Sequence, residues 1–97
     1  MIEDVDFGLK KAKNEGKPSL LYFRANWRGT CKAQERILEE VFPQVDAIFL
    51  KVDVEKYREL VEKYDILSVP SVVILDSEGN FKWRKSEIAN DLEIKEM

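Results

Sequence analysis

Cys31 carries the strongest potential nucleophile of the chain, and the sequence has neither a second cysteine nor any histidine. A lone cysteine cannot close a disulfide within its own chain and the usual zinc ligands are missing, so we predict no metal site and no other cofactor. A thiolate attacks disulfides, and it is favoured at the start of a helix and beside a cation. Cys31 lies near the start of a predicted helix, and Arg28 precedes it by three residues. Thiol chemistry is therefore the first chemistry to consider.

Cys31 has three interpretations at this point. It is a small, inert apolar side chain on the inner face of the helix. Alternatively, Arg28 and the helix dipole favour its thiolate, which permits monothiol exchange or oxidation sensing. In the third interpretation it forms an intermolecular disulfide with a partner or a second copy. Arg28 is either an exposed side chain without a role or a binding site for an anion or acidic partner, because a cation at a helix N-terminus opposes the dipole.

The order of apolar residues predicts alternating helices and strands. Helical spacing predicts helices over residues 6–15, 28–41 and 56–64, and a short one within 86–97 that rests on Ile88, Leu92 and Ile94. Apolar runs predict strands over residues 19–23, 47–54, 71–75 and 81–85, the last two forming a hairpin. The core candidates are Tyr22, Phe23, Phe49, Val52, Val72 and Ile74. This order predicts an α/β fold, in which helices flank a mixed central sheet of about four strands.

Size and charge restrict the classes of partner. The chain of 97 residues has the length of one domain, which we take as residues 1–97. Its net charge of −3 and its short basic runs argue against a nucleic-acid partner. No apolar run is long enough to cross a membrane, and the first residues do not form a secretion signal. We therefore expect a cytoplasmic protein without a membrane partner.

The stretch from about residue 17 to residue 82 contains several motifs that match one family when taken together. They are Phe23-Arg24-Ala25-Asn26-Trp27, the following Arg28-Gly29-Thr30-Cys31-Lys32, Lys51-Val52-Asp53-Val54, Tyr64-Asp65-Ile66-Leu67-Ser68-Val69-Pro70-Ser71, and Val72 to Leu75 with Gly79. With these motifs the chain resembles the thioredoxin family. The resemblance implies a three-layer thioredoxin-like fold and descent from disulfide oxidoreductases.

The resemblance also implies that the redox motif of this chain is degenerate. In the family, the first of two cysteines attacks a disulfide and the second resolves the mixed disulfide; here Arg28 holds the attacking position and Cys31 the resolving one. Tyr22 stands where the family commonly has a buried acid that moves protons for the second cysteine. Arg24 stands where the family usually has tryptophan, and no glycine follows the last strand near Lys85. The sequence therefore predicts no catalytic turnover by the two-thiol route.

Peptide binding is the function we expect to survive these changes. Pro70 resembles the family's cis-proline, which keeps a strand edge open beside the motif, and we predict a cis bond before it. Together with Trp27, Gly29, Thr30 and Val69 it forms a candidate groove for an extended peptide; Trp27 alone is equally well explained as a surface aromatic that packs on the motif loop. We expect a non-catalytic module with a protein or peptide partner. The alternative is a monothiol redox protein that acts through Cys31 with an external thiol reductant. No oligomeric state is predicted.

Overall fold

A mixed four-stranded sheet forms the centre of the computed structural model, which describes residues 1–26 and 29–96, the side chain of Thr30 excepted. The strands are β1 (Ser19–Arg24), β2 (Ile48–Asp53), β3 (Ser71–Leu75) and β4 (Phe81–Lys85), in the order β2-β1-β3-β4. β1 pairs with β2 in parallel and with β3 antiparallel, and β3 and β4 form the predicted hairpin. The mostly apolar strands β1 and β3 occupy the two central positions, as expected for strands buried on both faces.

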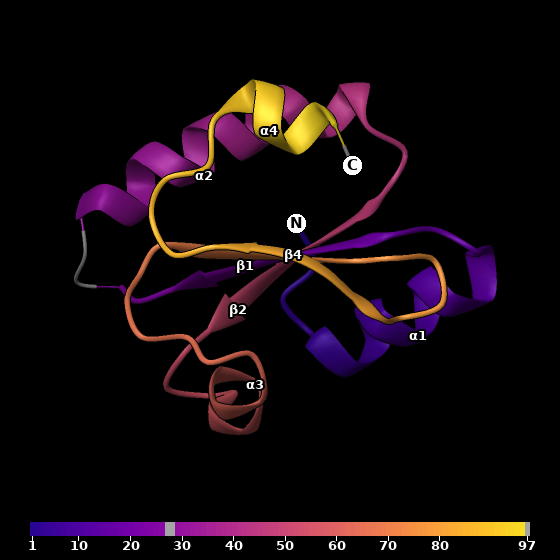
Figure 1. Cartoon of the computed structure of the whole chain (residues 1–97), viewed down its shortest axis with the longest axis horizontal. Helices are drawn as coiled ribbons and strands as arrows, with labels where there is room; N and C mark the ends of the chain where they lie inside the picture. Colours follow the sequence, from indigo (N-terminus) through magenta and orange to yellow (C-terminus); the bar gives the residue numbers. More distant parts are fainter. Residues whose placement is uncertain (27–28, 97) are drawn as a thin grey trace.

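Helices cover both faces of this sheet, which confirms the predicted α/β arrangement. They are α1 (Val5–Glu15), α2 (Gly29–Val41), α3 (Arg58–Lys63) and α4 (Asp91–Lys95), with a 3-10 turn over Phe42–Gln44. Figure 1 shows α2 and α4 on one face and α1 and α3 on the other. Within the described ranges, no helix has both the length and the apolar character that a membrane span requires.

The apolar side chains form two clusters, one on each face of the sheet. All six predicted core residues are buried. Phe23, Val52 and their neighbours pack under α1 and α3, whereas Tyr22, Phe49, Val72 and Ile74 pack under α2 and α4. The alternation of side chains along each strand produces this division. The position of α2 and its cysteine is thus fixed by the second cluster.

α1 approaches β2 closely at Gly8. A Cβ atom added at Gly8 would lie 2.0 Å from Cδ2 of Leu50, so a larger residue there forces that side chain to move. The helix begins one residue earlier than predicted, because Asp4 caps it by accepting a hydrogen bond from the amide of Phe7. It ends at Gly16, whose left-handed backbone closes the helix as predicted.

β2 and α3 are both shorter than the sequence predicts. β2 covers Ile48–Asp53 rather than 47–54, and α3 begins at Arg58 rather than at residue 56. The cause is a turn at Asp53, whose carboxylate accepts a hydrogen bond from the amide of Glu55 while its carbonyl accepts from Lys56. Tyr57 then has a non-helical backbone, so the helix starts only after it.

The C-terminal segment packs through Ile94, as predicted, and through Ala89, which was not predicted. Leu92 is 68% exposed, which makes its assignment to the buried face wrong, whereas Ala89 and Ile94 are fully buried. The reason is a capping box between Asn90 and Glu93, which starts the helix after Ile88 and sets its rotation. Gln34 of α2 holds the segment: its amide donates to the carbonyl of Ala89 (3.0 Å) and accepts from the Ala89 amide (2.7 Å).

Replacing Gln34 by alanine should destabilise the protein strongly. The Gln34→Ala change leaves two buried backbone groups of Ala89 without partners, so we expect the free energy of unfolding to fall by about 3 kcal/mol. Urea denaturation measures this. Gln44→Ala is the matched control, because Gln44 makes one exposed hydrogen bond to the Glu40 carbonyl; its effect should stay within about 0.5 kcal/mol. Equal losses in the two variants would contradict the role given to Gln34.

Candidate functional site

Cys31 is the third residue of α2 and is buried in the apolar cluster beneath that helix. It is 1% exposed and forms no disulfide. Its neighbours in the cluster include Leu20, Leu38 and Val72, and Val69 packs against the same cluster. The burial agrees with the first of the three interpretations, a small side chain on the inner face of the helix. The reactivity of the thiol stays a prediction.

A polar group lies beside Cys31 on the same face of the sheet. The hydroxyl of Tyr22 donates to the backbone carbonyl of Cys31 at 2.7 Å and lies 3.3 Å from a carboxylate oxygen of Glu35. Tyr22 itself is fully buried. Burial, followed by the proximity of Cys31 and Glu35, raises the pKa of Tyr22 well above its usual range. The phenol is therefore a neutral hydrogen-bond donor that joins β1 to α2.

The carboxylate of Glu35 is held by cations from two strands. Lys51 of β2, the register partner of Tyr22, places its ammonium 2.7 Å from Glu35 Oε1. Nε of Arg24 lies 4.0 Å from Glu35 Oε2 and has no hydrogen-bond partner among the described residues, although its atom is buried. Another guanidinium nitrogen of Arg24 donates to Asn26. We call Tyr22, Arg24, Glu35 and Lys51 the Glu35 cluster; a single carboxylate here neutralises one of two cations.

Sequence reasoning missed Glu35, because it grouped this residue with the charged positions between the apolar ones of α2. Its side chain is only 18% exposed. The available signal was its spacing: Glu35 follows Cys31 by four residues, which places both on one side of a helix. Tyr22, the residue at the position of the family's buried acid, contacts this carboxylate. Position 22 on β1 thus has no acid, but Glu35 supplies one from α2, on the same side of the helix as Cys31.

The predicted motif is described only from its second half. Trp27 and Arg28 lie outside the described residues, so the predictions for both stay predictions. Gly29 and Thr30 are the first two residues of α2, and Gly29 is exposed. Within residues 1–26 and 29–96, no group of three or more histidine, cysteine or acidic residues is placed to hold a metal ion.

The loop before β3 contains the predicted proline. The Val69–Pro70 peptide bond is cis, and Pro70 is buried while Val69 is half-buried. Two hydroxyls fix this loop: Ser71 donates to the carbonyl of Ser68 at 2.6 Å, and Ser68 donates to the carbonyl of Ser86 at 2.9 Å. Ser86 directly follows β4, so the loop is tied to the end of the hairpin.

An open hollow of about 330 Å³ adjoins this loop, and we call it the Leu67 groove. Its apolar lining comes from Ala25, Val54, Val61, Ile66, Leu67 and Val69, with Glu55, Arg58 and Ser68 as polar neighbours. Leu67 is 91% exposed, an unusual state for a leucine. Val69 belongs both to this lining and to the partly buried side chains that pack against the cluster containing Cys31.

Comparisons with known proteins agree with this geometry. The chain matches the thioredoxin family over residues 4–96. It is similar to a thioredoxin of Mycoplasmoides gallisepticum, at 32% identity over 90 residues that cover 92% of this chain and 89% of that protein. It is also similar to a thioredoxin H-type of Oryza sativa subsp. indica, at 34% identity over 76 residues that cover 75% of this chain. That match covers 61% of the rice protein, which is less than two thirds of its length.

A solved structure has the same fold. A mutant thioredoxin from Halobacterium salinarum NRC-1 superposes with a TM-score of 0.79 at 25% identity, covering 91% of this chain and 77% of that chain. This likeness confirms the three-layer thioredoxin-like fold.

Replacing Tyr22 by phenylalanine should reveal the buried phenol through the pH dependence of stability. Tyr22→Phe removes the hydrogen bond to Cys31, so near neutral pH the free energy of unfolding should fall by about 1–2 kcal/mol. Because the pKa of Tyr22 is raised in the folded protein, its contribution is complete below the unfolded-state value of 10.0 and is lost as the pH rises above it. The difference between the two proteins should therefore shrink in alkaline urea titrations.

Tyr64→Phe serves as the control near neutral pH, because no hydrogen bond of the Tyr64 hydroxyl occurs among the described residues. Its effect should stay within about 0.5 kcal/mol. A difference between wild type and Tyr22→Phe that stays constant from neutral to alkaline pH would exclude the raised pKa.

Proposed function

Since this chain belongs to the thioredoxin family, we propose that it is a non-catalytic module that binds an extended segment of a peptide or protein. The observation that carries this proposal is the state of its single cysteine, which is 1% exposed. A two-thiol reductase needs one thiolate to attack and a second thiol to release the product. This sequence has one thiol for both tasks, and Arg28 stands at the attacking position.

The surroundings of Cys31 support a structural role for it. The sulfur lies in an apolar cluster, where it contributes buried area like other small apolar side chains. The polar atoms beside it already have partners: the Tyr22 hydroxyl donates to a backbone carbonyl and Glu35 is paired with Lys51. No change of these contacts is needed for the fold to persist with a reduced, unreactive thiol.

The Leu67 groove is the binding surface we propose. Its apolar lining and the highly exposed Leu67 offer burial to a ligand, which is the main favourable contribution to such binding. The cis bond at Pro70 shapes the loop that borders it. An extended segment laid along this loop would add main-chain hydrogen bonds and place alternate side chains against the groove. From the sequence we also predict Trp27, Gly29 and Thr30 as part of the binding surface; Trp27 lies outside the described residues.

A monothiol redox protein is the second candidate. Cys31 lies in the first turn of α2, where unpaired backbone amides favour a thiolate. In this case Cys31 attacks a disulfide sulfur, one half leaves as a thiol, and an external thiol reductant releases the mixed disulfide. The Tyr22 phenol contacts the backbone carbonyl of Cys31, and the Glu35 carboxylate lies beside that phenol. This candidate requires the helix N-terminus to move away and expose the sulfur.

Alkylation of Cys31 separates the two candidates. We expect iodoacetamide to modify the folded protein at least about a hundredfold more slowly than the urea-unfolded protein, because the sulfur is reached only through local opening. Mass spectrometry over a range of pH gives the rate and the thiolate titration. A rate in the folded state equal to that of the unfolded chain, with a titration below the usual thiol range, would favour the monothiol candidate.

Peptide binding to the Leu67 groove is measured by NMR titration. An uncharged peptide of alternating leucine and threonine should shift the amide signals of Leu67, Ser68 and Val69. Leu67→Asp should weaken binding by about tenfold, because it removes an apolar contact and adds a charge. Leu92→Asp is the matched control, a highly exposed leucine on α4 that lies outside the groove. Equal affinity of the two variants would refute binding at the groove.

A further inference from the structure

β4 forms one edge of the sheet. It pairs with β3 on one side, and no described residue pairs with its other side. Figure 1 shows this strand in front of the other strands, between the helix layers rather than beneath one of them. The backbone amides and carbonyls along an open edge are ready to pair with a further strand. Whether an edge accepts one depends on the side chains that border it.

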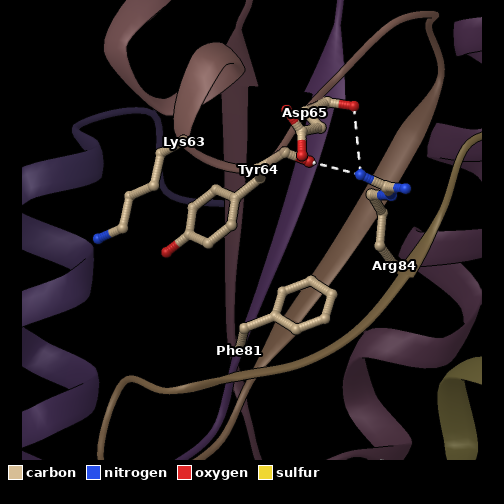
Figure 2. A pocket seen from close by; sticks show the side chains of 5 residues that line it. All are labelled: Lys63, Tyr64, Asp65, Phe81 and Arg84. Atoms are coloured by element: carbon tan, nitrogen blue, oxygen red, sulfur yellow. Dashed lines mark hydrogen bonds between the residues drawn. The ribbon is translucent and has the colours of Figure 1, made fainter.

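One face of β4 borders an aromatic pocket of about 660 Å³, shown in Figure 2. The rings of Tyr64 and Phe81 lie nearly parallel, with an interplanar angle of 22° and centroids 6.3 Å apart. Phe81 is 56% exposed. Arg84 donates to the backbone carbonyls of Tyr64 (2.9 Å) and Asp65 (3.3 Å), which anchors its guanidinium at the rim.

The charge of this aromatic pocket is positive. Lys63 and Arg84 supply two cations against the single carboxylate of Asp65. The Lys63 ammonium lies 5.5 Å from the centroid of the Tyr64 ring, and the hydrogen bonds of Arg84 go to neutral carbonyls. Among the described residues, neither cation has a carboxylate within ion-pair distance. An acidic side chain would therefore find unpaired cations here.

The opposite face of β4 borders a second, smaller pocket of about 170 Å³. Ile74 and Trp83 form its apolar part, and Lys82, Glu93 and Glu96 form its charged part. Because successive residues of a strand project to opposite faces, a strand added beside β4 would direct one set of side chains to the aromatic pocket and the other set here. A pocket for each set is the arrangement that gives strand addition its specificity.

We propose that the outer edge of β4 binds an acidic extended peptide by strand addition. Acidic side chains of the peptide lie at the aromatic pocket near Lys63 and Arg84, and apolar side chains lie at the pocket of Ile74 and Trp83. The surface is separate from the Leu67 groove and does not depend on the function proposed for it.

A second copy of the chain fits this edge poorly. β4 has three cationic residues, Lys82, Arg84 and Lys85, and no acidic one. Of these, Lys85 is paired with Glu93. Pairing two β4 strands would oppose cations across the new interface, which destabilises neighbouring strands. The same charge favours an acidic peptide, even though the net charge of the whole chain is −3.

The test uses a short fluorescent peptide of alternating glutamate and leucine, with binding followed by anisotropy at low salt. We expect a Kd on the order of 100 µM, weakening as salt screens the charges. Lys63→Glu should raise the Kd by about fivefold. Lys56→Glu is the matched control: Lys56 lies 5.5 Å from the centroid of the Tyr57 ring, so this change removes the same kind of contact and the same charge. The Kd of the Lys56→Glu variant for the peptide should stay within about twofold of the wild-type value.

Methylation of the peptide amides identifies backbone pairing. In an added strand, alternate amides face the edge, so methylating one alternate set should abolish binding and methylating the other should preserve it. Equal binding of both methylated peptides would overturn the proposal. The proposal would also be overturned if Leu67→Asp weakened peptide binding and Lys63→Glu did not, because the peptide would then lie in the Leu67 groove. Dimers that form through β4 in sedimentation equilibrium would make a second copy the occupant and overturn it as well.

Discussion

The packing of α2 against β1 is the constraint on which the surroundings of Cys31 depend. The inner side of this helix has Cys31, Gln34, Leu38 and Val41, all buried against the sheet. A polar group on such a surface is stable only if its hydrogen bonds are satisfied. Gln34 satisfies this condition with both of its amide atoms, and Cys31 satisfies it as a nearly apolar side chain. The helix thus has little freedom to change its position without breaking several buried contacts together.

The Glu35 cluster shows how a buried charge is accommodated at the border of that surface. Its carboxylate meets the ammonium of Lys51 and approaches the hydroxyl of Tyr22 and the guanidinium of Arg24. Isolated, such a carboxylate would be costly to bury; with these partners it joins β1, β2 and α2. The acid of the region therefore comes from α2 rather than from β1; β1 contributes a phenol and one cation, and β2 contributes the other cation.

The sequence was sufficient for the order and type of the main helices and strands and for the hairpin of β3 and β4, because their apolar patterns are long and regular. It also indicated the cis peptide bond before Pro70. Element ends were harder, since Asp4, Asp53 and Asn90 move them through single side-chain hydrogen bonds that hydrophobic periodicity does not register. Glu35 and Leu92 were misjudged for a related reason. The exposure of Glu35 depends on partners from β1 and β2, which are distant in the chain, and that of Leu92 on the rotation that the capping box of Asn90 and Glu93 gives a short helix, which apolar spacing alone does not show.

The pair of hydrogen bonds between Gln34 and Ala89 joins two segments that are 55 residues apart in the chain. Short terminal helices commonly fray, because few contacts resist their local unfolding. Here the amide of Ala89 becomes free only after its hydrogen bond to the side chain of Gln34 on α2 breaks. The segment after β4 therefore belongs to the same cooperative unit as α2, so its amide hydrogens exchange with solvent on the timescale of the core rather than that of a chain end.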